Sequence, residues 1–232
     1  MDAYTDFAGV YDIFMDNTPY QEWADFLTEL IEKYGISKRR QYAEGVERGD
    51  GSIQEEILNS EKNLVLDLGC GTGTLTELLY QKGFDMVGVD NSEDMLNAAF
   101  AKRESSGSGI LYLCQDMREL DLYSTVGTVV CVCDSINYLL EADQVEDTFK
   151  LVNNYLYPGG LFIFDFNTLY KYEQVIGDVT IAENRDECSF IWENFYHGEE
   201  RINEYDLTIF VKETERDLFR RFTEQIPLRL FL

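Results

Sequence analysis

The glycine-rich segment 69–73 is the feature of this sequence that most restricts its fold. It directly follows a short apolar run, Leu64–Leu68, and precedes a helical pattern of leucines that ends at Gly83. A short apolar run is typical of a strand that is buried on both faces of a parallel sheet. Glycines between such a strand and a helix let the main chain approach a ligand closely. The segment therefore predicts a strand–loop–helix unit with a ligand at the amino end of the helix.

Further apolar runs separated by helical patterns follow this unit. Ser92 is expected to cap one of the intervening helices, and another is expected over residues 142–156. Strands that alternate with helices indicate parallel crossovers. The predicted fold class is therefore α/β, with a doubly wound, mostly parallel, Rossmann-like sheet. Besides the run at 64–68, the expected strands are Asp85–Val89, Ile110–Cys114, Val126–Cys133 and, after a turn at Pro158-Gly159-Gly160, Leu161–Phe166.

The chain is expected to divide into three parts. Residues 1–60 form an N-terminal helical lid and connector, in which a helix begins at Pro19 with Thr18 as its N-cap and Gln21 completing a capping box. A weak helical pattern lies at 53–58. Residues 61–168 form the ligand-binding core. Residues 169–232 form an antiparallel β excursion on the substrate side, with strands near Phe190–Tyr196, Ile202–Val211 and Leu218–Gln225.

Charge and composition limit the partners and the compartment. The chain has 44 acidic and 19 basic residues, for a formal net charge of −25. Such a surface repels phosphate backbones and anionic lipids, so neither nucleic acid nor membrane is an expected partner. The start of the sequence lacks a signal-peptide pattern, and the five cysteines form no C-x-x-C pair. We therefore expect a cytoplasmic location, with neither a disulfide framework nor a metal site.

The residues after the predicted strands indicate a nucleoside ligand. Asp90 closes the second strand, at the usual place for a carboxylate that binds ribose hydroxyls. Asp116 and Met117 follow the third strand, where a carboxylate can accept the adenine amino group and an apolar side chain can line the ring. Thr74 stands where a dinucleotide-binding motif requires glycine. A nicotinamide-dependent oxidoreductase is thus the less favoured alternative, also because no Tyr-x-x-x-Lys proton relay follows the fourth strand.

These motifs together resemble the class I S-adenosylmethionine (SAM)-dependent methyltransferases, specifically a bacterial small-molecule branch. The resemblance extends over about residues 4 to 225. The segments that carry it are Tyr4, Phe7-Ala8, Tyr11-Asp12, Met15, Tyr20 and Trp23, then Leu66–Gly73, Gly88-Val89-Asp90, Asp94-Met95-Leu96, Asp116–Leu120, Asp134–Leu139 and Pro158-Gly159-Gly160.

The resemblance implies SAM as the cofactor and a small molecule as the methyl acceptor, with in-line displacement as the reaction. It places the glycine loop at the methionine part of SAM, Asp90 at the ribose, and the pair Asp116-Met117 beside adenine. Asp134 would lie beside the sulfonium, and Tyr11 is expected to close over the cofactor. The expected cofactor-binding residues are Tyr11, Asp67, Gly69, Cys70, Gly71, Gly73, Asp90, Asn91, Met95, Asp116, Met117 and Asp134.

No catalytic residue is assigned from the sequence. His197 is a base by residue type, although its polar turn favours a solvated position, and Asp134 could accept a proton or the cofactor's ammonium group. Expected substrate-side residues, each with a structural role as the alternative, are Asn137, Tyr138, Trp192 and Tyr196. The alternative function is a degenerate SAM-binding or regulatory protein without turnover.

One segment departs from the pattern of the resembling family. Those proteins usually continue past the antiparallel strands into a further helix and a strand hairpin, and they carry a histidine and a tyrosine after the excursion. Here the matching stretch is residues 224–231, and Ile226 stands at the position of the histidine. The expectation is either a shortened sheet or an edge that a partner chain covers, as in a homodimer.

Overall fold

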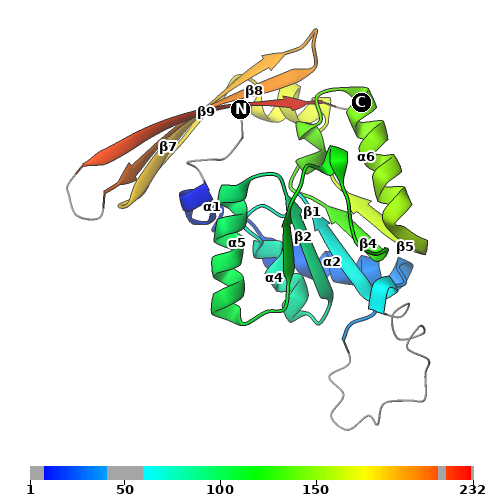
Figure 1. Ribbon diagram of the computed structural model, residues 1–232. Helices are drawn as coiled ribbons and strands as arrows, with labels where there is room; N and C mark the ends of the chain where they lie inside the picture. The colour runs from blue at the N-terminus through cyan, green and yellow to red at the C-terminus, as the bar shows by residue number, and fades with distance from the viewer. Residues whose placement is uncertain (1–7, 41–59, 214–217, 231–232) are drawn as a thin grey trace, which may run out of the picture.

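A five-stranded parallel sheet forms the centre of the protein. The computed structural model describes residues 8–40, 60–213 and 218–230. The strands lie in the order β3-β2-β1-β4-β5, so that consecutive βαβ units wind outward on both sides of β1 (Figure 1). The predicted α/β class is confirmed. The strands are β1 (Leu64–Leu68), β2 (Asp85–Asp90), β3 (Leu111–Cys114), β4 (Val126–Cys131) and β5 (Leu156–Phe164).

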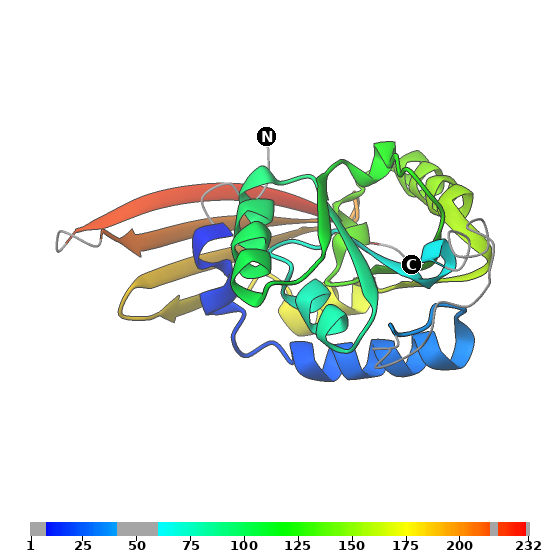
Figure 2. The same cartoon turned by 60° about the horizontal axis from the view of Figure 1, so that its bottom comes forward.

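Helices cover both faces of this sheet because its strand residues are apolar on both sides. Alternate residues such as Val65 and Leu66 belong to two different buried clusters, one on each face. The first face packs on α2 (Tyr20–Tyr34), α4 (Thr74–Gln81) and α5 (Glu93–Ser106), and α2 lies against α4 (Figure 2). The second face packs on α6 (Ala142–Tyr155), which contributes Phe149 and Val152.

Several boundaries differ from those expected. The predicted capping box at the start of α2 is wrong, because Pro19 occupies the N-cap and the Thr18 hydroxyl is directed to the sulfur of Met15, 3.7 Å away. The glycines predicted as a turn at 158–160 lie inside β5, whose pairing with β4 is irregular there. The cap at Ser92 is confirmed, since its hydroxyl oxygen accepts the Met95 N–H at 3.3 Å. The weak helical pattern at 53–58 lies outside the described residues.

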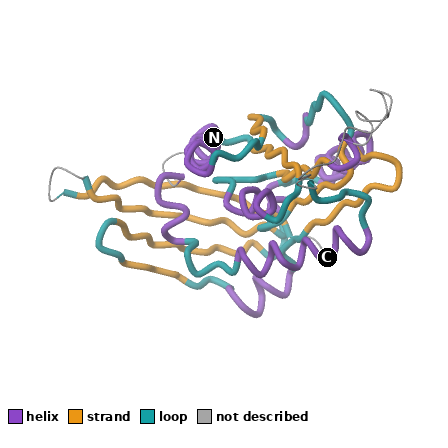
Figure 3. Tube along the Cα trace, turned by 90° about the horizontal axis from the view of Figure 1, so that it is seen from below, coloured by secondary structure: helices purple, strands orange, loops and turns teal. Residues whose placement is uncertain are grey.

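A four-stranded antiparallel sheet lies beyond the carboxyl ends of the parallel strands (Figure 1). Its strands run side by side and extend past the helices (Figure 3), which confirms the predicted antiparallel excursion. The first strand was not expected from the sequence, and the other three are longer than predicted. The strands, in the order β6-β7-β8-β9, are β6 (Thr180–Asn184), β7 (Cys188–His197), β8 (Ile202–Lys212) and β9 (Phe219–Arg229).

The inner face of the antiparallel sheet is apolar, and short helices pack on it. Alternate residues of β8, namely Tyr205, Leu207 and Ile209, are buried. At one end they contact α1 (Ala8–Phe14), where the rings of Phe14 and Phe190 meet edge to face with centroids 4.6 Å apart. At the other end they contact the π-helical turn η3 (Lys171–Ile176) through Tyr172. No helix within the described residues is long and apolar enough to cross a membrane.

Candidate cofactor and active site

The principal cavity opens at the carboxyl ends of β1, β2, β3 and β4. It encloses about 220 Å³ between the glycine loop on one side and α1 on another. A ligand site at this edge is typical of doubly wound sheets. The residues that line it are Tyr11, Leu68, Gly69, Gly71, Val89, Asp90, Asn91, Met95, Gln115, Asp116, Met117, Arg118, Cys133, Asp134, Ser135, Tyr138 and Leu139.

The glycine loop follows β1 because the chain must turn there with positive φ angles. Gly69, Gly71 and Gly73 have φ of +81°, +53° and +74°. A Cβ on Gly69 would lie 2.6 Å from the Ser135 hydroxyl, whereas a Cβ on Gly71 would meet nothing within 4 Å. The space beside Gly71 is therefore open to a ligand, and the main chain there can approach it without a side chain between.

Gly73 has a packing role that the sequence did not indicate. It lines neither described cavity, and it is the N-cap residue of α4. A Cβ at this position would lie 2.5 Å from the Tyr112 hydroxyl. Close packing of the loop, α4 and β3 therefore requires glycine at this position.

Asp90 links the end of β2 to the glycine loop. Its Oδ2 accepts the Gly71 N–H at 2.8 Å, and its Oδ1 accepts the Ser92 N–H at 2.9 Å. Burial raises the pKa of this carboxyl, and the backbone donors Ser92 and Gly71 act in the opposite direction. The side chain lines the cavity beside Asn91, so its remaining lone pairs face the space where ribose hydroxyls are expected.

Asp67 supports the loop from beneath. It is 2% exposed, and its Oδ2 accepts the Thr76 hydroxyl of α4 at 2.6 Å. Burial raises its pKa to about 6, and the nearby Asp90 acts in the same direction. Asp67 reaches only a second, smaller cavity of about 40 Å³ on the far side of the loop, where Tyr20 and Cys70 also contribute.

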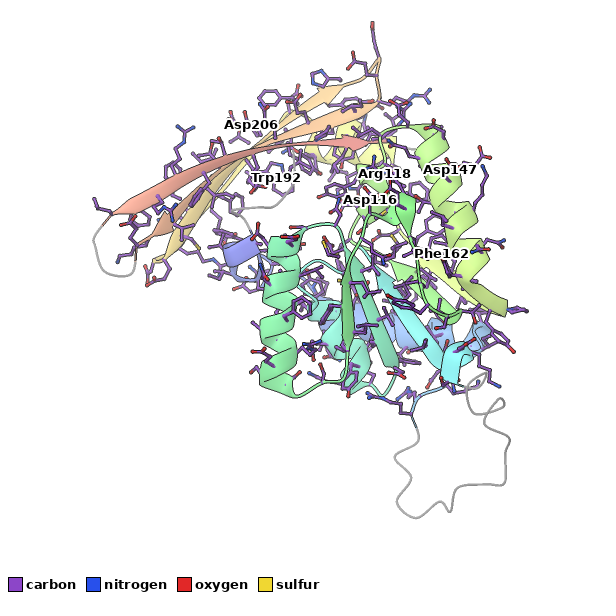
Figure 4. All side chains as sticks on the ribbon, viewed as in Figure 1. Asp116, Arg118, Asp147, Phe162, Trp192 and Asp206 are labelled. Carbon is purple, nitrogen blue, oxygen red and sulfur yellow. The ribbon has the colours of Figure 1, made fainter. Side chains whose placement is uncertain are left out.

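Asp116 lies at the cavity but is engaged by Arg118 (Figure 4). Nε of Arg118 donates to both carboxylate oxygens, at 2.9 and 3.0 Å. This pairing holds the pKa of Asp116 below its usual range. An adenine amino group would thus share Asp116 with a guanidinium that the sequence-based prediction did not include. Met117 and Met95 contribute apolar side chains to the cavity wall.

The turn after β4 brings Cys133, Asp134 and Ser135 into the cavity. The Oδ2 of Asp134 accepts Nδ2 of Asn167 at 2.7 Å, and Oδ1 of Asn167 accepts the Lys171 ammonium at 2.8 Å. Burial raises the pKa of Asp134 to about 6, Lys171 opposes this shift, and Asp165 adds to it. Asp134 is therefore ionised above pH 6.

Helix α1 covers the cavity, with Tyr11 lining both spaces around the glycine loop. Asp12 anchors the helix to that loop, since its Oδ1 accepts the hydroxyls of Thr72 at 2.7 Å and Thr74 at 3.0 Å. Lys102 of α5 completes the anchor through an ion pair of 2.6 Å with Asp12 and a hydrogen bond of 2.6 Å to Thr74 Oγ1. Thr74, which stands where a dinucleotide motif has glycine, thus helps to hold α1 over the cavity through its hydrogen bonds to Asp12 and Lys102.

Of the expected substrate-side residues, Tyr138 alone lines the cavity. Asn137 is fully buried, and its amide nitrogen donates to the carbonyls of Asn167 at 3.1 Å and Arg229 at 2.6 Å. Trp192 lies on the inner face of the antiparallel sheet (Figure 4), edge-on to Tyr205 with centroids 4.6 Å apart. The structure does not bring Asn137, Trp192 or Tyr196 to the cavity wall.

His197 lies at the end of β7, opposite Ile202 in the β7–β8 hairpin. Its side chain is 47% exposed, and Nε2 is 3.5 Å from a Glu204 carboxylate oxygen. It does not line either described cavity. This is the solvated position that its polar turn favours, so Asp134 is the better placed of the two expected proton acceptors.

Sequence reasoning missed several residues of the cavity wall. Gln115, Arg118 and Leu139 lie next to residues that were expected, so their position along the chain was the available signal. The same signal applied to Cys133, which was expected as the last residue of a strand and precedes Asp134. The wall residues absent from the prediction are Leu68, Val89, Gln115, Arg118, Cys133, Ser135 and Leu139.

Comparison with known proteins identifies the family of the chain and agrees with this fold. Residues 65–160 match the family model described as "Methyltransferase domain". A relative from Geobacillus sp. strain WCH70, named as a methyltransferase, is 34% identical over 97% of this chain and 84% of its own length. The chain belongs to the class I SAM-dependent methyltransferases, and SAM is the cofactor of that class.

Two further proteins are similar to this chain, one in sequence and one in sequence and structure. YqeM of Bacillus subtilis, also named as a methyltransferase, is 34% identical over 98% of this chain and 80% of its own. The crystal structure of a SAM-dependent methyltransferase from Clostridium acetobutylicum superposes with a TM-score of 0.76 at 30% identity, covering 99% of this chain and 82% of that one. These matches give no support to the nicotinamide-dependent alternative.

The residues present fit SAM. The cavity is lined by three carboxylates, Asp90, Asp116 and Asp134, and by one guanidinium that Asp116 already pairs with. Such a set suits a ligand that carries a sulfonium and an ammonium group. The bare main chain at Gly71 leaves room for close approach. No group of three or more metal-ligating side chains occurs within the described residues.

Proposed function

We propose that the protein transfers the methyl group of SAM to a small-molecule acceptor by in-line displacement. The observation that supports this proposal is that the cavity extends beyond the residues expected to bind the cofactor. It runs from the glycine loop and Asp90 past Asp134 to Tyr138. The Tyr138 ring packs against the buried cluster under the antiparallel sheet. The acceptor would enter on that side, between the nucleoside-binding edge and the sheet.

The residues of the cavity would hold the cofactor as follows. Asp90 would accept ribose hydroxyls, and Met95 and Met117 would pack on the adenine faces. Asp134, ionised above pH 6, would accept the cofactor's ammonium group. Bound SAM supplies a methyl carbon that is already activated by the sulfonium. The protein's contribution is then to align the acceptor with that carbon and to exclude water.

Tyr11 and the anchor of α1 would provide that exclusion. The ring of Tyr11 lines both spaces beside the glycine loop, so α1 covers the reacting region from the solvent side. Its electron-rich face is suited to a sulfonium cation. The hydroxyls of Thr72 and Thr74 hold Asp12, and with it the helix, in this position.

The charge of the chain favours a small neutral or cationic acceptor. A formal charge of −25 opposes the approach of a nucleic acid, and the strands over the cavity carry acidic residues such as Asp206 on their outer face (Figure 4). If the acceptor nucleophile carries a proton that it must lose, Asp134 would be the base among the three carboxylates of the cavity, in place of its contact with the ammonium group.

Calorimetric titration with SAM, S-adenosylhomocysteine and NADH tests the site. We expect saturable binding of the first two and none of the third. Transfer of a labelled methyl group is then followed against small amines, phenols, thiols and carboxylic acids, with bulk RNA and a denatured protein as macromolecular acceptors. Label in a small molecule supports the proposal. Binding of NADH in place of SAM, or label only in the macromolecules, would overturn it.

A further inference from the structure

The turn after β4 has an unusual backbone conformation. Cys133 and Asp134 are consecutive, and their φ angles are +60° and +53°. Within the described part of the chain, Arg201 is the one other residue besides glycine with positive φ. A side chain makes this left-handed region unfavourable, and such residues persist only when their surroundings hold them there. Two in succession at the cavity wall require a specific cause.

The cause lies at the end of the neighbouring strand. Asp165 follows β5, and its Oδ2 accepts the Cys133 N–H at 3.1 Å while its Oδ1 accepts the Asp134 N–H at 2.8 Å. Its own N–H donates to the Cys131 carbonyl at 3.2 Å, so the β4–β5 pairing places the carboxylate opposite the turn. Consecutive N–H groups that converge on one anion form a backbone nest.

The charges around this contact make it costly. Asp165 lies close enough to Asp134 to raise the pKa of the Asp134 carboxyl, and Lys171 acts against that repulsion. Lys171 also opposes the raised pKa of Asp165. An apolar or amide side chain at 165 would avoid the repulsion. The carboxylate is explained by the two N–H groups that it accepts, since no neutral side chain can accept both with two equivalent oxygens.

The same turn determines the wall of the cavity. Cys133, Asp134 and Ser135 all line it, and the Ser135 hydroxyl donates to the Val132 carbonyl at 2.8 Å inside the same turn. If the chain left the left-handed region at 133, the Cα–Cβ directions of these residues would change. Asp134 would then lose both its place in the cavity and its contact with Asn167.

We propose that Asp165 is a positioning residue, whose carboxylate holds Cys133 and Asp134 in the left-handed turn and thereby directs Asp134 into the SAM cavity. This inference rests on the proposed cofactor contact of Asp134. Asp165 itself does not line the cavity, so its effect on the cofactor passes through the backbone of the turn.

A double-mutant cycle with glycine tests this proposal. Glycine adopts positive φ without steric cost, so Cys133→Gly removes the part of the conformational demand that arises at residue 133 and leaves the part at Asp134. Asp165→Asn is compared with the wild type, and Cys133→Gly/Asp165→Asn with Cys133→Gly, by SAM titration at pH 7.5. Asp147→Asn, on the outward face of α6 (Figure 4), controls for the loss of one negative charge.

We expect Asp165→Asn to weaken SAM binding about tenfold in the wild-type background, which corresponds to about 1.4 kcal/mol. In the Cys133→Gly background the same change should weaken SAM binding less than about threefold, because a glycine at 133 needs less support from the carboxylate. Two independent sites would instead give equal losses in both backgrounds. Equal losses in both backgrounds would overturn the proposal and assign Asp165 a direct role. An unchanged affinity of Asp165→Asn would overturn it as well.

Ligand-free unfolding separates this inference from the cofactor site. Asp165→Asn should lower the melting temperature, and the drop should be smaller when residue 133 is glycine. If the wild type fails to bind SAM, the proposed function fails, while the unfolding cycle still decides whether Asp165 holds the turn. Equal drops in the two backgrounds would refute that role.

Discussion

Asp67 is a buried carboxylate whose ionisation should weaken the fold. Its folded-state pKa is about 6, against an ordinary value of 3.8, mainly because it is buried. Between these values the folded protein binds more protons than the unfolded chain, so stability falls as the pH rises. One pKa unit corresponds to about 1.36 kcal/mol, so the full difference is about 3 kcal/mol. The loss is complete above pH 6 and absent below about pH 3.8.

Asp67→Asn should remove this pH dependence while retaining an acceptor for the Thr76 hydroxyl. Between pH 4.5 and pH 8, we expect the free energy of unfolding of the wild type to fall by about 2 kcal/mol more than that of the variant. Urea unfolding at both pH values measures the difference, and the exposed Asp147→Asn serves as the control. Parallel pH profiles for wild type and Asp67→Asn would refute the reasoning.

Four further variants probe the cavity and helix α1, which covers it. Gly71→Ala should weaken SAM binding and lower stability by about 1–2 kcal/mol because of its positive φ. Gly73→Ala should lower stability by about 2–4 kcal/mol, since its Cβ would in addition meet the Tyr112 hydroxyl at 2.5 Å. Titration and urea unfolding of both variants would contradict this if Gly71→Ala lost more stability and Gly73→Ala more affinity. Asp90→Asn should weaken SAM binding by about 1–3 kcal/mol, and an unchanged calorimetric affinity would argue against the ribose contact. Lys102→Met should speed hydrogen exchange in α1, with a stability loss of at most about 1 kcal/mol because the ion pair is partly exposed; unaltered exchange would show that the anchor does not hold the helix.

Much of the parallel core could be predicted because its signals are local. The apolar runs of β1, β2 and β4 alternate with helical patterns, and glycines mark the loop that follows β1. Strand ends in a parallel sheet share one edge, so the sequence alone was enough to place Asp90, Asp116 and Asp134 together. Their common cavity follows from that topology.

The remaining features depend on contacts between distant segments. In the sequence Gly73 cannot be told apart from the other glycines of the loop. Its packing against Tyr112 of β3, which leaves no room for a Cβ, is visible only in the structure. The turn at 133–134 contains neither glycine nor asparagine, so the local signal for positive φ is weak and rests on Asp134 alone. β6 was missed because its five residues, Thr180–Asn184, show little apolar alternation and acquire their strand conformation by pairing with β7.

Helix α1 constrains how the two sheets of the enzyme can move relative to each other. On one side Asp12 is bonded to Thr72 and Thr74, and on the other Phe14 packs into the aromatic cluster beneath β7. If the antiparallel sheet moves away from the nucleoside-binding edge, one end of this seven-residue helix has to give way. Either the hydrogen bonds of Asp12 break, or the Phe14 ring leaves its contact with Phe190. Helix α1 is thus one mechanical link between the two ligand-facing layers, and the hydrogen bond from Asn137 to the Arg229 carbonyl of β9 is another.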